Sequence, residues 1–194
     1  MTSDNALCRM TAVEAAGRIA ARTLSPVALM EAVLARAARL DPVLRLFAEP
    51  MFDAAREGAH QALIAVKSGA ALGPLHGVPI TIKDNIAVAG VPMRAGSAAV
   101  PVSVPAADGL TVQRVRGAGA IVIGKTTLPE FAHKVLTDNA IDGATRNPWS
   151  LAHTPGGSSG GTSAALAVGV APLGIGTDGG GRSGARRPAP AWLG

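Results

Sequence analysis

Apolar residues in the first part of the chain recur at the spacing of an α-helix. The stretch 27–40 is predicted to be an amphipathic helix with Leu29, Met30, Val33, Leu34 and Ala37 on one face. Ser25-Pro26 is a helix-start signal, and Thr11-Ala-Val-Glu14 predicts a capping box for an earlier helix. Asp41-Pro42 predicts the end of the 27–40 helix. A further helix is predicted over about 53–67, closed by Ser68-Gly69.

Beyond this helical region, short apolar runs alternate with helical patterns. Strands are predicted at 78–82, 120–123 and 173–176, and helices at 110–116, 128–133 and 159–170. This alternation predicts an α/β fold with a mostly parallel or mixed sheet covered by helices. We expect a helical N-terminal region over residues 1–70, an α/β core over residues 71–181 and a divergent tail over residues 182–194.

Composition narrows the class of protein. The chain is 48% hydrophobic and 16% charged, which is typical of a globular domain. Of its net charge of +5, three positive charges come from arginines in the tail. Phe and Trp number only three and two, so no stacking surface for nucleic acid is expected. The single Cys8 excludes an internal disulfide, and the four dispersed histidines lack metal-ligand spacing. Neither a signal peptide nor an apolar run long enough to span a bilayer is visible. We therefore expect a cytoplasmic protein without a metal or cofactor and without a nucleic-acid or membrane partner.

The most informative segment is Gly156-Gly157-Ser158-Ser159-Gly160-Gly161, which stands just before an alanine-rich helix. Glycines permit sharp turns and close backbone approach, so a serine between them can be aimed by the backbone. Lys83 stands at the predicted end of an apolar strand, where partial desolvation disfavours its charged form. A neutral lysine beside a serine can act as a base for hydrolytic chemistry.

Several segments together resemble the amidase signature family. They are Gly77-Val-Pro-Ile-Thr-Ile-Lys83-Asp-Asn-Ile86, Gly119-Ala-Ile-Val-Ile-Gly-Lys-Thr126, Thr145-Arg-Asn-Pro-Trp149, Pro155-Gly-Gly-Ser-Ser-Gly-Gly161 and Gly176-Thr-Asp-Gly-Gly-Gly181, in the family's order. The resemblance implies an amidase-signature fold that cleaves carboxamide C–N bonds through a serine, a bridging serine after a cis peptide bond, and a lysine. It implies that Lys83 is the lysine, Ser158 the bridging serine, and the amides of Gly179, Gly180 and Gly181 the oxyanion hole. The implied substrate is a small-molecule amide.

The family's nucleophile does not carry over. The family places a serine directly after its glycine turn, whereas here Arg182 follows Gly181 and Ser183 comes one position later. Arginine is permanently protonated and cannot attack a carbonyl. The tail then departs from the family pattern, so we expect a fold that is incomplete at the C-terminus, from a truncated or frame-shifted copy. The resulting expectation is an impaired amidase with Ser183 as a displaced nucleophile candidate, or else a non-catalytic remnant; the oligomeric state is not predicted.

A nucleotide-binding module is the alternative from another class. Gly119-Ala-Ile-Val-Ile-Gly-Lys-Thr126 matches the phosphate-loop expression G-x-x-x-x-G-K-[ST]. A phosphate loop needs its amides to curl between the glycines, whereas Ala-Ile-Val-Ile favours an extended strand. The interpretation preferred here is a buried strand with Lys125 at its end.

Overall fold

The computed structural model describes residues 3–179, in which a run of helices is followed by short strands and helices in largely alternating order. The helices are α1 (Ser3–Leu7), α2 (Ala12–Ala20), α3 (Pro26–Leu44), α4 (Phe52–Ser68), α5 (Leu110–Gly117) and α6 (Gly160–Ala167), with a 3-10 turn η1 (Glu130–Ala132). The strands are β1 (Phe47–Pro50), β2 (Pro79–Lys83), β3 (Ile121–Thr126), β4 (Asp138–Asn139), β5 (Gly143–Ala144) and β6 (Leu173–Ile175).

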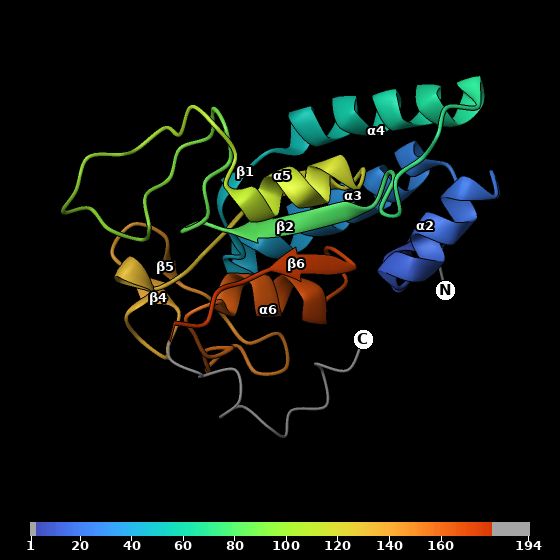
Figure 1. Ribbon diagram of the computed structural model, residues 1–194. Coiled ribbons are helices and arrows are strands. Elements are labelled where there is room, and N and C mark those ends of the chain that lie inside the picture. Colours follow the sequence, from blue (N-terminus) through green and yellow to red (C-terminus); the bar gives the residue numbers. More distant parts are fainter. Residues whose placement is uncertain (1–2, 180–194) are drawn as a thin grey trace.

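The main sheet has four strands in the order β1-β3-β2-β6. β2 pairs in parallel with both β3 and β6, whereas β1 runs antiparallel to β3, so the sheet is mixed. Apolar residues of β2 and β3 pack against α5, and α6 contacts β2 and β6 from the other side of the sheet (Figure 1). The predicted α/β class is thus confirmed, and Lys83 ends a strand that has neighbours on both sides.

The pairing of β2 with β3 contains a bulge. Ile80 lies opposite Val122, but the next residue of β2, Thr81, lies opposite Gly124, so Ile123 has no partner in β2. A bulge of this kind shifts every later pair by one position. As a result, Lys83 is paired with Thr126.

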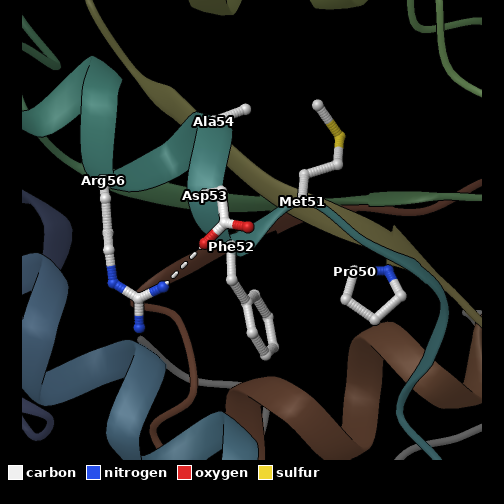
Figure 2. A pocket seen from close by; sticks show the side chains of 6 residues that line it. All are labelled: Pro50, Met51, Phe52, Asp53, Ala54 and Arg56. Carbon is white, nitrogen blue, oxygen red and sulfur yellow. Dashed lines mark hydrogen bonds and ion pairs between the residues drawn. The ribbon is translucent and has the colours of Figure 1, made fainter.

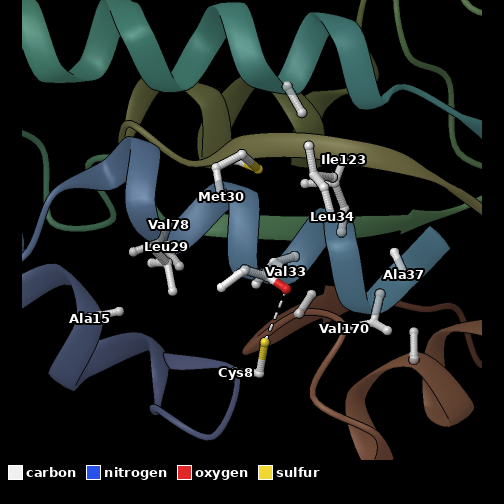
Figure 3. Packing of buried hydrophobic residues seen from close by; sticks show 14 of the residues in the cluster. Cys8, Ala15, Leu29, Met30, Val33, Leu34, Ala37, Val78, Ile123 and Val170 are labelled. Carbon is white, nitrogen blue, oxygen red and sulfur yellow. Dashed lines mark hydrogen bonds between the residues drawn. The ribbon is translucent and has the colours of Figure 1, made fainter. Parts of the chain in front are cut away.

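The larger apolar core lies between the N-terminal helices and the sheet. Met30 and Leu34 of α3 lie beside Ile123 of β3, and Cys8 donates its thiol to the carbonyl of Ala32 (Figure 3). The same cluster extends to α6 and to Val170, beyond it. One continuous core therefore crosses the predicted boundary between residues 1–70 and 71–181, while the division into those regions stays a prediction. The predicted tail, residues 182–194, lies outside the described residues.

Local start signals were predicted well, and helix ends less well. Thr11 Oγ1 accepts the Glu14 amide at 3.1 Å and Ser25 Oγ accepts the Ala28 amide at 3.4 Å, as the capping signals indicate. The predicted stop at Asp41-Pro42 is wrong, because α3 continues to Leu44. The Asp41 carboxylate accepts the amides of Leu46 and Phe47, which stabilises this extra turn and the exit from it.

Three further expectations are corrected by the structure. The predicted helix over 128–133 is only the three-residue turn η1, and the helix predicted over 159–170 ends at Ala167. The predicted strand at 120–123 starts at Ile121 and continues to Thr126. Strand β1 was not predicted, because its four residues are held in place by pairing with the distant β3.

Candidate functional site

Lys83 is the last residue of β2 and is completely buried. Its ammonium nitrogen Nζ donates to Ser158 Oγ at 2.7 Å, although the two residues are 75 positions apart in the sequence. The structure therefore brings together the two side chains that the sequence singled out. Burial disfavours the charged form of a lysine, which is the form that cannot act as a base.

Ser158 lies in the glycine turn directly before α6 and is 4% exposed. The peptide bond between Gly157 and Ser158 is cis, as the resemblance implies for the bridging serine. Thr137 holds this turn from both sides: its hydroxyl donates to the Gly156 carbonyl at 2.7 Å and accepts the Gly160 amide at 3.1 Å. These bonds fix the backbone that aims Ser158 at Lys83.

Thr177 is a partner of Lys83 that the sequence analysis missed. Its Oγ1 accepts from Lys83 Nζ at 2.8 Å and from Asn85 Nδ2 at 3.0 Å. Its backbone is held by Ser159, whose hydroxyl accepts the Thr177 amide at 3.2 Å and donates to the Thr177 carbonyl at 3.1 Å. The available signal was topological, because Thr177 follows β6, and parallel neighbours such as β6 and β2 end at the same edge of a sheet.

A second buried lysine has a different environment. Lys125 of β3 pairs with Asp84 Oδ1 at 2.7 Å and donates to the carbonyls of Asp84 and Pro92, both at 3.2 Å. Asp84 Oδ2 in turn accepts the amides of Arg94 and Ala95, which ties down the loop after Lys83. Burial lowers the pKa of Lys125 from its ordinary value, against the opposing effect of the Asp84 carboxylate.

The phosphate-loop alternative does not agree with this geometry. Four of the residues that would have to curl around a phosphate, Ile121 to Gly124, form part of the extended strand β3. Lys125 is engaged with Asp84 and is completely buried. The preferred interpretation of a buried strand is confirmed.

The remaining predicted site residues lie at or beyond the edge of the described structure. Gly179, the first of the three expected oxyanion-hole residues, is the last described residue and is exposed. Gly180, Gly181, Arg182 and the displaced candidate Ser183 lie outside the described residues. Their roles stay predictions.

A hollow of about 380 Å³, whose lining includes neither Lys83 nor Ser158, lies where β1 passes into α4 (Figure 2). Its lining residues are Pro50, Met51, Phe52, Asp53, Ala54 and Arg56. Arg56, the cation on this wall, is already paired with Asp53 and Glu31, each at 3.0 Å. The charged side chains of this hollow are therefore already engaged with each other or with Glu31 and are poorly placed to bind a ligand.

Within residues 3–179, no cluster of three or more His, Cys, Asp or Glu side chains is arranged to hold a metal ion. The helices of this same part of the chain are too short or too polar to cross a membrane.

Comparison with known proteins decides the family. The profile of the family described as Amidase matches residues 28–190, which is most of the chain. The chain belongs to the amidase family. Among relatives in this family, a subunit of the glutamyl-tRNA(Gln) amidotransferase of Acidothermus cellulolyticus is 44% identical over 183 residues, covering 94% of this chain and 36% of that protein.

Other members of the amidase family are similarly close. The putative amidase AmiB2 of Mycobacterium tuberculosis is 48% identical over 155 residues, covering 79% of this chain and 33% of its own length. The structure of the peptide amidase from Stenotrophomonas maltophilia superposes with a TM-score of 0.83 at 37% identity, covering 89% of this chain and 37% of that one. The chain thus spans about a third of the length of these relatives, and the expected amidase-signature fold is confirmed over that part.

Proposed function

We propose that this chain carries the base and the bridging hydroxyl of a hydrolase that cleaves carboxamide C–N bonds. The observation that supports this most is the 2.7 Å contact between Lys83 Nζ and Ser158 Oγ inside a fold of the amidase family. The proposed substrate is a small-molecule amide, and the mechanism uses side chains and backbone amides alone. We also propose a cytoplasmic location, because a lone buried cysteine suits a reducing compartment.

The proposed relay moves protons between three groups. Neutral Lys83 takes the hydroxyl proton of Ser158, and Ser158 takes a proton from the attacking serine, whose oxygen bonds to the amide carbon. The developing negative charge is held by amides of the turn formed by Gly179, Gly180 and Gly181. The proton then returns along the same path to the leaving amine, and water releases the acid from the acyl-enzyme.

The sequence breaks this relay at its last member. Arg182 occupies the position at which the resemblance requires the attacking serine, and a guanidinium is neither a nucleophile nor a base. We therefore propose that the chain as written is an impaired copy, with Lys83 and Ser158 in place but without the hydroxyl that they would activate.

The impairment is tested with the purified chain and a simple aryl amide such as p-nitroacetanilide. We expect no release of the amine above background, and no change on Lys83→Met. Amide turnover by the unaltered chain that disappears in Lys83→Met would refute the impairment.

The relay itself is tested by restoring the missing hydroxyl with Arg182→Ser and treating the protein with a small fluorophosphonate, which modifies activated serines. We expect modification at position 182 that is lost in Arg182→Ser combined with Lys83→Met or with Ser158→Ala. Modification at position 182 that does not depend on Lys83, or none at all, would contradict the proposed roles of Lys83 and Ser158.

A further inference from the structure

Ser158 occupies an unusual position in a chain whose sequence lacks a serine at position 182. Its hydroxyl is 2.7 Å from the nitrogen of Lys83, which is the distance expected of a nucleophile and its base. In the proposed relay Ser158 only passes a proton onward. Without a hydroxyl at position 182, deprotonation of Ser158 by Lys83 leaves the negative charge on Ser158 itself.

Within residues 3–179, the second hydroxyl bonded to Lys83 is that of Thr177, and it is not available in the same way. Thr177 Oγ1 accepts from both Lys83 Nζ and Asn85 Nδ2, and a hydroxyl oxygen has two acceptor positions. The Thr177 hydroxyl proton therefore points away from Lys83. Among the described hydroxyls that contact Lys83, that of Ser158 is therefore the one that can give its proton to the lone pair of a neutral Lys83.

The neighbouring serine is also engaged. Ser159 Oγ accepts the amide of Thr177 and donates its proton to the carbonyl of the same residue. The hydroxyl proton of Ser159 is thus already donated to a backbone carbonyl, and Ser159 contacts Thr177 rather than Lys83. Of the two serines in the glycine turn, Ser158 is thus the one whose proton can move to a base.

We propose that Ser158 and Lys83 form a serine–lysine dyad in which Ser158 is itself the nucleophile toward small activated electrophiles. The proposal rests on the proposed function in one respect, the role of Lys83 as a base. Serine–lysine pairs without a third residue are a known variant of nucleophilic catalysis. With a fluorophosphonate, the bond between Ser158 Oγ and phosphorus forms, the phosphorus–fluorine bond breaks, fluoride leaves, and the Ser158 proton ends on the Lys83 amine.

The burial of Ser158 limits what it can attack. With 4% of its surface exposed, it is open only to small reagents, and we expect slow modification that falls steeply with the size of the electrophile. Fluoride leaves without needing a proton, whereas the amine of an amide must be protonated before it can leave. The dyad is therefore expected to take up one phosphonyl group per chain and not to turn over amides.

The test uses the 194-residue chain, a small fluorophosphonate and mass spectrometry of tryptic peptides. Trypsin cuts after Arg146 and Arg182, so Ser158 lies in the peptide 147–182 and Ser183 lies in the next one, 183–186. We expect one adduct per chain, placed on Ser158 by fragmentation of the first peptide. Its rate should fall about 100-fold or more in Lys83→Met, which is the usual size of a general-base contribution.

Matched variants keep the result interpretable. Ser158→Ala should abolish the adduct, whereas Ser163→Ala, one turn into α6, should leave it unchanged while far-ultraviolet circular dichroism confirms folding of each variant. The rate should rise with pH to a plateau in the unaltered chain, and this pH profile should be absent in Lys83→Met. A variant that only disturbs the structure has no reason to remove the pH profile while keeping the fold.

The outcomes separate this inference from the proposed function. An adduct on Ser183, on Ser159, or nowhere in the unaltered chain overturns the dyad. If the unaltered chain gives no adduct but Arg182→Ser is modified at position 182 in a Lys83-dependent manner, the dyad fails and the relay stands. If Ser158 is modified in the unaltered chain but position 182 stays unmodified in Arg182→Ser, the dyad stands and the relay fails.

Discussion

Replacing Lys125 with methionine tests whether the buried ion pair holds the loop that follows Lys83. Methionine nearly keeps the volume of the side chain but removes the 2.7 Å contact with Asp84 Oδ1 and the two hydrogen bonds to the carbonyls of Asp84 and Pro92. Asp84, 1% exposed, would then be a buried carboxylate whose donors within residues 3–179 are the Arg94 and Ala95 amides.

Leaving one charge of a buried pair without its partner typically costs about 3–5 kcal/mol. That is a large part of the stability of a small domain, which is about 5–15 kcal/mol. Lys125→Met combined with Asp84→Asn should cost about 2 kcal/mol less than Lys125→Met alone, because the neutral amide oxygen can still accept the two backbone amides while no charge stays buried.

The assay is urea unfolding at pH 7 followed by far-ultraviolet circular dichroism, with both variants and the parent chain. Lys134→Met is a matched control: Lys134 pairs with Asp138 at 3.2 Å, both side chains are about half exposed, and the expected loss is below about 0.5 kcal/mol. A loss of less than about 1 kcal/mol in Lys125→Met, or a double variant less stable than Lys125→Met alone, would refute this account of the pair.

Three further predictions test other parts of the structure. Gly161→Ala would place a Cβ 2.6 Å from the Thr127 amide nitrogen and should lower the free energy of unfolding by about 1–3 kcal/mol or more. Gly17→Ala, in the interior of α2 with nothing within 4 Å of the new Cβ, should raise the free energy of unfolding by about 0.5–1 kcal/mol. Thermal melts compare the two variants. Burial raises the pKa of Asp142 above its ordinary 3.8, so the ionised form of Asp142 destabilises the fold at neutral pH. Asp142→Asn should therefore be more stable than the parent chain at pH 7, and this difference should vanish as the pH falls through the raised pKa toward 3.8. Urea midpoints of the two proteins that do not converge at low pH would contradict this prediction. Thr11→Ala removes the cap of α2 and should cost about 1 kcal/mol in chemical denaturation, while Thr11→Ser should retain most of the stability.

The features that were predictable from the sequence are those that local physics determines. The caps at Thr11 and Ser25 and the end of β2 at Lys83 depend on residues a few positions apart, so their patterns are visible in the chain. The pairing of Lys83 with Ser158 was expected only because several motifs together resembled one family. No single motif predicted this pairing.

The features that escaped prediction depend on contacts between distant segments. β1 exists because it pairs with β3, and the extra turn of α3 exists because the Asp41 carboxylate accepts amides beyond the proline. Thr177 is 94 positions from Lys83, and only the order of strands in the sheet places it there. The ion pair of Lys125 with Asp84 likewise needs the parallel register of two strands that periodicity alone does not give.

The unpaired Ile123 in β3 keeps two interior cations apart. If Ile123 were paired with Thr81 instead of being skipped, continuous pairing from Ile80 and Val122 would set Lys83 directly opposite Lys125, and residues paired across adjacent strands project to the same face. Two ammonium groups would then compete for one cavity and for one carboxylate. As the chain stands, Lys83 is paired with Thr126 and Lys125 with Ile82, so one cation is directed to the glycine turn and the other to Asp84. Pairing Ile123 into the ladder would thus bring the two buried lysines together as one repulsive pair.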